Sequence, residues 1–445
     1  MPKIVIIGAG SQHFAKDFIT DVLMYPELRD STIALVDIDK ERLELMTAFT
    51  KKIVKQHGFN TKIESTTNRL EVLEGADYVV NAIETGWNQA RIDREITNKH
   101  GIPWDDTIGP AGVFKGLRQT QVILDICHDM EKLCPSSWFM NFSNPQAINC
   151  WSINDYTRIK SVGLCPNQHG GVERIVKDAG ISFDEVSYWL AGINHFSWYL
   201  EFKWRGEDYY PILREKFKGD VFSWPNAGWD RRDVNGNRVG VDLVEVEMFK
   251  TFGYFTNGSS GHIPLYVPYF MKRPELIEKY NLGTVGIFSA GTKRMKDQDE
   301  EFKRQVKSDY KFPITNDFRW SIFAANIVHS IKTGIPRRIN CNVKNKGIIT
   351  NLLEGCCVEV PCLVDKEGIH PCYVGDLPPQ CAALIRPSIN VQELAVRGIA
   401  EKDKTKILQA ILVDPLTSAV LTIDEIRLMV EELFQANKEY VQGFK

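Results

Sequence analysis

The segment KIVIIGAGSQHF, residues 3–14, decides the fold of this chain. Its β-branched run at 4–7 is typical of a short buried strand, and the turn Gly8-Ala9-Gly10-Ser11 follows at once. Apolar residues with helical spacing occupy 14–24. In a strand–turn–helix unit the first glycine permits the tight turn, and the second lets a phosphate approach the positive helix N-terminus. The third glycine of the usual fingerprint is absent, because His13 stands where it would fall.

The next stretch of chain continues the alternation of strands and helices. Apolar runs at 32–36, 78–80 and 138–142 predict strands, and the pattern at 40–57 predicts a long amphipathic helix. Strands separated by helices of this length predict a parallel, doubly wound sheet. We therefore expect an α/β fold with a Rossmann-like N-terminal domain similar to that of lactate and malate dehydrogenases.

Asp37 ends the second predicted strand, near the place where a carboxylate binds the adenosine ribose of a dinucleotide. A carboxylate there repels a 2′-phosphate, so we expect NAD rather than NADP, held by Gly8, Gly10, Ser11 and Asp37. The alternative is that Asp37 caps the following helix.

Three polar segments fall where strands of such a sheet end. They are 81–86, 106–112 and 141–145. Ligands of open α/β sheets bind at these carboxyl ends, so Asn81, Glu84 and Asn141 are predicted to contact the cofactor. The alternative is ordinary turn chemistry, since Asn, Asp, Gly and Pro are common in turns.

Composition restricts the class of protein. A chain of 445 residues suggests two packed domains, here expected at 1–160 and 161–445, the second a mixed α+β domain ending in a helix at 422–440. A net charge of −3 argues against nucleic acid, and no apolar run reaches the length of a membrane span. The chain begins without a signal peptide pattern, and its ten scattered cysteines indicate thiols in the reducing cytoplasm.

Cys165 follows the strand-like residues 160–162, and His195 lies about thirty residues later. Thiolate and imidazole are ligands of borderline divalent metals. Their spacing is no motif by itself, and from the residues alone a buried thiol with a core histidine is the more common outcome for such a pair.

Strings along the whole chain resemble one known family. In the first half they are 3–14, 106–112, 114–118, 141–145, 163–165 and 191–198. These resemble glycoside hydrolase family 4, the NAD- and Mn-dependent glycosidases. Further strings at 345–352, 358–361, 376–383 and 390–395 are similar to its α-galactosidase and α-glucosidase branch.

The resemblance implies an unusual hydrolytic mechanism. In this family NAD is thought to oxidise the sugar C3 hydroxyl, which acidifies the C2 proton; a base removes that proton and the aglycone leaves C1 by elimination. Water then adds back and the hydride returns. A divalent metal, Mn²⁺ or another, holds the sugar oxygens and polarises the new carbonyl. The family's habit of assembly implies a homodimer or homotetramer.

The resemblance also carries residue roles. Cys165 and His195 match the metal ligands, Asn144 and Asn194 match residues that contact the sugar, and Tyr266 matches the base of some branches. Tyr266 needs a lowered pKa for that role; the alternative is an aromatic ring packed under the site. We assign Asp106 to the catalytic group as well.

Two departures from the family pattern affect the chemistry. Pro166 stands where some members carry the proposed acid, so His169 is the nearest candidate that can donate a proton near neutral pH. Asn257 and Gly261 replace expected acidic residues, which could admit an anionic sugar such as a uronide or a sulfonated glycoside. Arg118 could hold such an anionic group bidentately.

Aromatic and basic residues offer further contacts to a sugar. Trp87, Trp104, Trp198 and Trp229 could stack on sugar faces, although large aromatic residues belong mostly to cores. Arg91 and Arg94 fit solvated helix faces better than a binding site.

Two other functions remain open at this level. A plain NAD-dependent sugar or hydroxy-acid dehydrogenase would need a His–Asp relay and no metal. A sugar-sensing protein with a degenerate site would bind without turnover.

Overall fold

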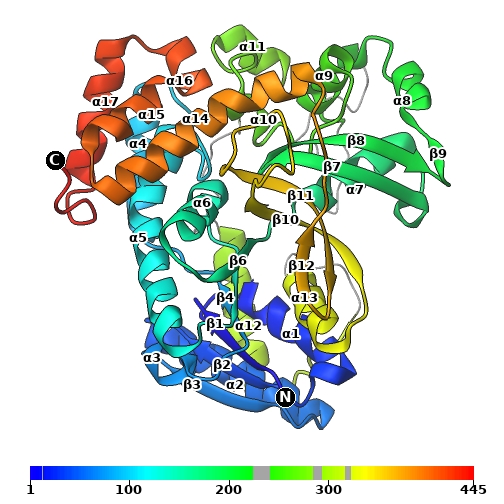
Figure 1. The fold of residues 1–445 in the computed structure, drawn as a ribbon, viewed down its shortest axis with the longest axis vertical. Helices are drawn as coiled ribbons and strands as arrows, with labels where there is room; N and C mark the ends of the chain where they lie inside the picture. The colour runs from blue at the N-terminus through cyan, green and yellow to red at the C-terminus, as the bar shows by residue number, and fades with distance from the viewer. Residues whose placement is uncertain (13, 224–240, 284–292, 316–321) are drawn as a thin grey trace.

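The computed structural model describes residues 1–12, 14–223, 241–283, 293–315 and 322–445 (Figure 1). Its first half is built on six parallel strands, which lie in the order β3-β2-β1-β4-β5-β6. Their bounds are Lys3–Ile7 (β1), Thr32–Val36 (β2), Lys62–Thr66 (β3), Tyr78–Asn81 (β4), Trp138–Asn141 (β5) and Lys160–Gly163 (β6). This is the strand order of a doubly wound dinucleotide-binding sheet, so the predicted fold class is confirmed.

Helices cover both faces of this sheet. They are α1 (Phe14–Met24), α2 (Lys40–His57), α3 (Leu70–Leu73), α4 (Trp87–Lys99), α5 (Gly109–Leu133) and α6 (Gln146–Tyr156). The central strand β1 buries Ile4 and Ile6 in one apolar cluster and Val5 and Ile7 in another. A parallel strand buried on both faces explains why its sequence is continuously apolar.

The sheet does not stop at the end of the first half. β6 pairs antiparallel with β10 through Gly163 and Asn342, and the sheet continues in the order β10-β11-β7-β8-β9, with β12 beside β11. These strands are β7 (Val186–Ile193), β8 (Phe196–Trp204), β9 (Glu207–Asp208), β10 (Arg337–Lys344), β11 (Cys357–Asp365) and β12 (Gly368–Pro371). One twelve-stranded sheet therefore runs through both halves, and the expected boundary at 160 and 161 falls at the start of β6.

The second half adds helices around the extended sheet. They are α7 (Asn167–Ala179), α8 (Tyr210–Lys216), α9 (Leu243–Phe252), α10 (Ile263–Tyr266), α11 (Pro274–Lys279), α12 (Lys293–Lys307), α13 (Ile322–Thr333), α14 (Pro379–Glu401), α15 (Lys404–Leu412), α16 (Pro415–Val420) and α17 (Ile423–Ala436). Short 3₁₀ turns occupy Pro26–Leu28, Phe183–Glu185 and Val221–Ser223. The predicted last helix is α17, which begins after a capping box between Thr422 and Glu425.

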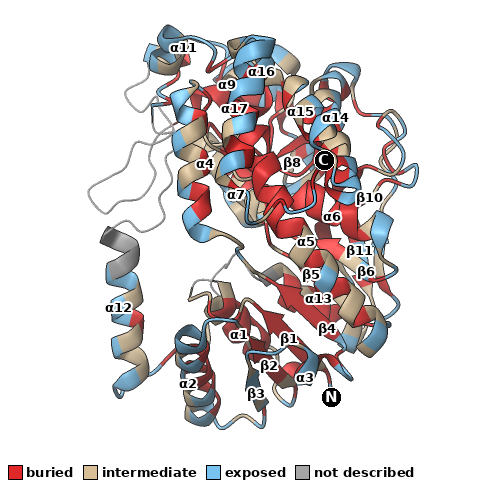
Figure 2. Cartoon of the chain, turned by 90° about the vertical axis from the view of Figure 1, so that its left-hand side faces the viewer, coloured by how far each residue is buried: buried red, intermediate tan, exposed pale blue. Residues whose placement is uncertain are grey.

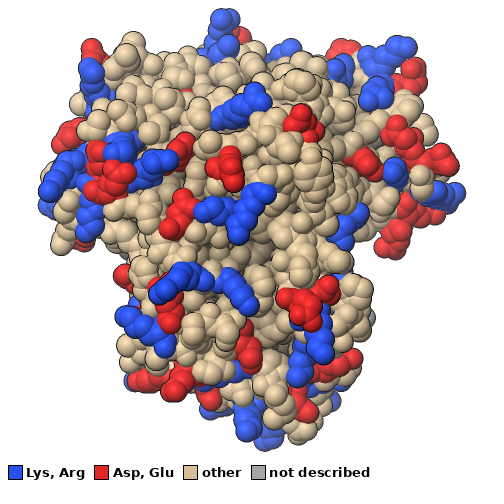
Figure 3. Space-filling model, in the orientation of Figure 1, with Lys and Arg blue, Asp and Glu red and all other residues tan. Residues whose placement is uncertain are grey.

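Burial follows this layering. Figure 2 shows the central strands and the inner faces of the helices buried, with exposed residues on the outer helix faces, while the edge strand β3 is mostly exposed. On the face in Figure 3, Lys and Arg are interspersed with Asp and Glu. The described helices include none with the length and apolarity needed to cross a membrane.

Candidate active site at the carboxyl edge of the sheet

The glycine turn after β1 lies against the ends of the two neighbouring strands. Gly8 has φ +85°, and a Cβ on it would lie 2.6 Å from the Ala82 carbonyl oxygen after β4. The Gly10 amide donates to Asp37 Oδ2 at 2.7 Å, and Ser11 Oγ accepts from the Phe14 amide at the start of α1. The N-cap of α2 is Asp39, so Asp37 is not the helix cap. This arrangement places Asp37 beside the turn, as the dinucleotide hypothesis expects.

Asn81 and Asn141 form a buried polar floor at the ends of β4 and β5. Asn81 Nδ2 donates to Asn141 Oδ1 at 2.9 Å and to Ser143 Oγ at 3.2 Å. Both asparagines are fully buried. Their hydrogen bonds to each other and to Ser143 hold the loop after β5 in place.

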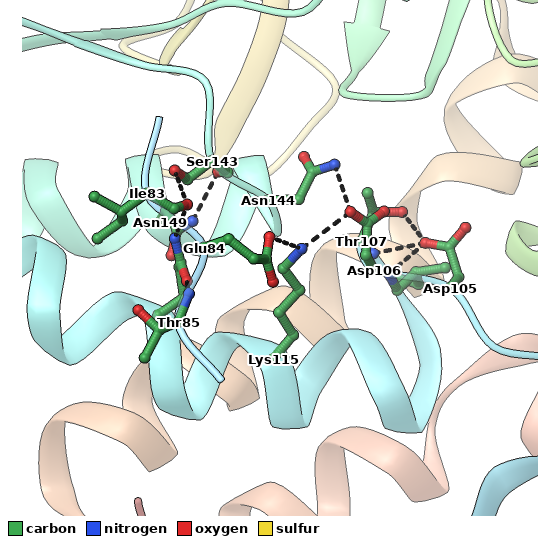
Figure 4. A network of polar contacts seen from close by, with 12 residues as sticks. Ile83, Glu84, Thr85, Asp105, Asp106, Thr107, Lys115, Ser143, Asn144 and Asn149 are labelled. Carbon is green, nitrogen blue, oxygen red and sulfur yellow. Dashed lines mark hydrogen bonds and ion pairs between the residues drawn. The ribbon is translucent and has the colours of Figure 1, made fainter. Parts of the chain in front are cut away.

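A charged network surrounds Lys115 (Figure 4). Lys115 on α5 donates to Glu84 Oε2 at 2.8 Å and to Asp106 Oδ2 at 3.1 Å, and Asn144 Nδ2 donates to the same Asp106 oxygen at 3.0 Å. Burial alone would raise the pKa of Asp106, but Lys115 and the Asn144 amide outweigh it and hold that pKa at about 2. Asp106 is therefore a carboxylate held in place by Lys115 and Asn144.

Cys165 and His195 come together from two strand ends. Cys165 follows β6, His195 lies in the turn between β7 and β8, and Cys165 Sγ is 3.2 Å from His195 Nε2. Burial raises the pKa of Cys165 to about 12 and keeps the pKa of His195 below its usual value. Both groups are therefore neutral near pH 7, and a divalent cation held by them would have to displace the thiol proton.

These residues fit a divalent cation. A thiolate with an imidazole suits borderline metals such as Mn²⁺, Co²⁺ or Zn²⁺. Asn194 Nδ2 and His195 Nδ1 are buried beside the pair without a hydrogen-bond partner in the described part of the chain. Within that part no third His, Cys, Asp or Glu completes a protein-only cluster, so a cation held by Cys165 and His195 would need further ligands from outside this set.

Tyr266 and His262 line the same region. Tyr266 Oη donates to Thr107 Oγ1 at 3.0 Å and lies 3.3 Å from the Asn194 carbonyl oxygen. Burial raises the pKa of Tyr266 well above its usual value, which is the opposite of what a base requires. The His262 ring lies 4.0 Å from the His195 ring, and its Nδ1 is 3.2 Å from Asp105 Oδ2.

Two predicted site residues lie in other surroundings. Arg118 is almost fully buried, and its Nη1 donates to Asp93 at 2.6 Å and to Asn437. His169 packs on Phe183 at 4.3 Å between ring centroids, and burial lowers its pKa to about 4. A histidine with that pKa is neutral near pH 7.

The remaining candidates are divided between core and surface. Trp198 is fully buried and Trp87 is half exposed, while Arg91 pairs with Glu95 on the surface of α4. His13 and Trp229 lie outside the described residues.

Sequence reasoning missed Lys115, Asp105, His262 and Glu359. Lys115 carried a usable signal, because it lies among Val113, Phe114 and Leu117 in an otherwise apolar helical stretch. A lysine in such a stretch is buried, and buried lysines need acidic partners. Glu359 carried a similar signal inside a strand of valines and cysteines.

Two family models match this chain. Family 4 glycosyl hydrolase matches residues 3–181, and the Family 4 glycosyl hydrolase C-terminal domain matches residues 190–417. The chain belongs to glycosyl hydrolase family 4. The predicted resemblance and the predicted enzyme class are thereby confirmed. The second match covers the C-terminal strings, which favour a glycosidase over a plain dehydrogenase.

The relatives of this family 4 enzyme include galactosidases. An alpha-galactosidase of Bacillus subtilis (strain 168) is 33% identical over 100% of both chains. An alpha-galactosidase of Rhizobium meliloti (strain 1021) is 32% identical over 99% of this chain and 89% of its own. A solved 6-phospho-alpha-glucosidase from gut microorganisms, in complex with NAD and Mn²⁺, has the same fold, with a TM-score of 0.82, 20% identity and coverage of 99% and 98%. Its two bound groups are the cofactors predicted for this chain.

Proposed function

We propose that this family 4 glycosidase hydrolyses α-galactosides with NAD and a divalent cation, Mn²⁺ in the first place. The observation that carries the proposal is the Cys165–His195 pair, 3.2 Å apart at the carboxyl edge of a dinucleotide-binding sheet. The two α-galactosidase relatives, similar over nearly the whole chain, support the choice of sugar.

The glycine turn and Asp37 would hold NAD, and Cys165 with His195 would hold the cation. When bound, NAD takes a hydride from the sugar and returns it, and the cation polarises the sugar oxygens. The rest of the site orients the sugar. Because Asp106 accepts from Asn144 Nδ2, the Asn144 carbonyl oxygen is left to accept from a sugar hydroxyl.

Proton transfers are assigned to Tyr266 as base and to His169 or water as acid. The Tyr266 hydroxyl donates a hydrogen bond to Thr107 Oγ1, which fixes the position of the phenol oxygen. Its raised pKa means that bound cation and substrate have to lower it before it can accept a proton. His169 is neutral near pH 7, so a role as acid requires a bound substrate or a rearrangement to raise its pKa.

The structure favours a neutral sugar over an anionic one. Asn257, whose lack of charge suggested an anionic substrate, is fully buried and directs its side chain to Ser197 and Glu359. Carboxylates at Glu84, Asp105 and Asp106 remain in the site. Lys115 offsets one of these charges, and the negative charge that remains would weaken binding of a uronate or sulfonate placed beside it.

The test is release of p-nitrophenol from aryl α- and β-galactosides, glucosides, glucuronides, galacturonides and a sulfoquinovoside. Each is assayed with and without NAD, Mn²⁺ and reductant. We expect cleavage of the α-galactoside that requires both NAD and Mn²⁺ and gives no net NADH. Preference for a uronide or a sulfonated glycoside would mean that the substrate is an anionic sugar and not a galactoside. NADH accumulation on free sugars would indicate a dehydrogenase. Binding without turnover would indicate a sugar-sensing protein.

We also propose that the enzyme is a cytoplasmic homodimer or homotetramer. All ten cysteines are free thiols, nine of them buried, which suits a reducing compartment. Assembly rests on the family resemblance, and light scattering of the purified enzyme measures it.

A further inference from the structure

His195 holds its place through an unfavourable backbone conformation. Ile193 and Phe196 are opposite each other in the β7–β8 ladder, so Asn194 and His195 are the two residues of the hairpin turn. His195 has φ +63°, a region that favours glycine. Such a conformation persists only where the surroundings impose it.

The segment around Asn257 imposes it from one side. The Asn257 amide donates to the Ser197 carbonyl at 2.9 Å, and the Ser197 amide donates to Asn257 Oδ1 at 2.8 Å. The next residue, Gly258, lies so close that a Cβ on it would be 2.3 Å from the His195 carbonyl oxygen. The turn is therefore packed directly against this segment.

Glu359 imposes it from the other side. It lies on β11 opposite Gly192, and its Oε2 accepts from Asn257 Nδ2 at 3.0 Å. The same oxygen lies 3.1 Å from Ser197 Oγ, whose single proton it shares with the Ile193 carbonyl oxygen at 2.8 Å. Asn257, Ser197 and Glu359 are all fully buried. Arg174 on α7 donates to the Asn257 carbonyl at 3.1 Å, which ties the same segment to the helix that follows Cys165.

We propose that Asn257 is a positioning residue for the cation site, which clamps Ser197 between its own amide and Glu359 and thereby holds His195 against Cys165. This inference rests on the proposed binding of a cation by Cys165 and His195. In this chain the Asn257 amide suits both neighbours, because it accepts from the Ser197 backbone N–H with one atom and donates to the Glu359 carboxyl with the other. An acidic residue at 257 would set two carboxyl groups against each other.

Co²⁺ titration of the full-length enzyme tests this, since a cobalt–thiolate bond absorbs in the near ultraviolet. Wild type should develop the band and Cys165→Ala should not. Asn257→Asp should raise the Co²⁺ dissociation constant by about 10- to 100-fold, the usual cost of losing a residue that orients a metal ligand. NAD binding, followed by intrinsic fluorescence, should be unchanged. Glu359→Gln should bind Co²⁺ like wild type, because a neutral carbonyl accepts the same two hydrogen bonds.

The matched control is Asn345→Asp. Asn345 is as deeply buried, donates to the Ile349 and Leu353 carbonyls and lies at the end of β10 away from the pair. This variant should lose stability and keep its Co²⁺ affinity. If Asn257→Asp does not fold, Ser197→Ala removes the hydroxyl contacts to Glu359 and to the Ile193 carbonyl at the start of the turn, and it should weaken Co²⁺ binding by about two- to tenfold.

The outcomes separate two failures. No thiolate band in wild type, or a band that survives Cys165→Ala, removes the proposed metal site. A band in wild type with unchanged affinity in Asn257→Asp, or equal losses in Asn257→Asp and Asn345→Asp, removes the role of Asn257 and leaves the metal site standing.

Discussion

Lys115 is the cation that pairs with both Glu84 and Asp106. It is buried and lies between Glu84 and Asp106, which would otherwise face each other without a counter-ion. Burial lowers the pKa of Lys115, but Asp106 and Glu84 outweigh it and raise that pKa above the usual value. The ammonium is therefore permanent and fixes where the two carboxylates point.

Replacing Lys115 by methionine should both destabilise and inactivate the enzyme. Lys115 is buried but Glu84 and Asp106 are 31% and 24% exposed, so the loss should be about 2–3 kcal/mol, below the roughly 3–5 kcal/mol of a fully buried pair, and the resulting displacement of Asp106 should lower kcat by about 100-fold. Lys115→Arg, which keeps the charge, should retain much more activity. Urea unfolding and p-nitrophenyl α-galactoside kinetics measure both effects.

Arg69→Met supplies the comparison for that experiment. Arg69 pairs with Asp129 at 2.6 Å, but both side chains are partly exposed. An exposed pair contributes about 0–1 kcal/mol, so this variant should stay close to wild type in stability and activity. Equal behaviour of the two methionine variants would contradict the role given to Lys115.

At the residue scale the sequence predicted best what local geometry determines. The glycine turn and Asp37 belong to one strand–turn–helix and the strand beside it, and the structure brings them within hydrogen-bond distance. Cys165 and His195 are thirty residues apart, so only the family resemblance joined them. Arg118 was expected at the sugar, but its partners Asp93 and Asn437 come from distant segments that spacing does not reveal.

At the scale of elements, α7, the helix that follows Cys165, packs closely against the sheet. Gly170 and Gly171 are adjacent in this helix. A Cβ on Gly170 would meet its nearest neighbour at 3.6 Å, whereas a Cβ on Gly171 would lie 2.3 Å from the Tyr199 hydroxyl on β8. Tyr199 is fully buried and donates to the Gln168 carbonyl, so its ring has no free space to move into.

Alanine at these two positions should therefore have opposite effects. Gly170→Ala should stabilise the enzyme by roughly 0.5–1 kcal/mol, because it lowers the entropy of the unfolded chain and improves helix propensity. Gly171→Ala should destabilise it by about 1–3 kcal/mol through overpacking. Denaturant midpoints of the two variants, measured side by side, decide the matter; the same sign for both would show that α7 packs otherwise.

Elements with strong periodicity were predicted closely. The helices at 14–24 and 40–57 have those bounds in the structure, and the strand at 32–36 does as well. β3 was missed because its residues Lys62–Thr66 are mostly exposed at the sheet edge and carry no apolar run. The joining of β6 to β10 was not predicted either, since pairing between distant segments leaves no local pattern.

For the molecule as a whole, stability should depend on pH through Asp414. This buried residue caps α16 through Thr417, and burial raises its pKa from 3.8 to about 6 despite those hydrogen bonds. A carboxyl with a raised pKa gives its full contribution below pH 3.8 and loses it as the pH rises through 6. The neutral Asp414→Asn keeps the cap, so above pH 6 it should exceed wild type in unfolding free energy by on the order of 2–3 kcal/mol.

The measurement is thermal unfolding of both proteins between pH 4 and pH 8. Their difference should be small at pH 4 and reach a plateau above pH 6. Asp403→Asn is the control, since Asp403 caps α15 at the surface and its hydrogen bonds to Lys406 lower its pKa. That variant should gain no stability at neutral pH, and a difference between Asp414→Asn and wild type that does not change with pH would contradict the assignment.

Cation binding should also stabilise the whole molecule. A ligand that binds only the folded state adds about 2.7 kcal/mol at a hundred times its Kd. Mn²⁺ should therefore raise the Tm of wild type, EDTA should reverse the change, and Cys165→Ala should show neither effect. An unchanged Tm at saturating Mn²⁺ would place the cation elsewhere than at a preformed site.

The single sheet that crosses both halves has a consequence for synthesis of the protein. Gly163 on β6 pairs with Asn342 on β10, and 179 positions separate them. A ribosome adds roughly 5–20 residues per second, so the edge of β6 waits roughly 9–36 seconds for its neighbour to be made. During that interval the nascent chain exposes the unpaired backbone groups of β6, a surface that chaperones can cover and at which two unfinished chains can pair and aggregate.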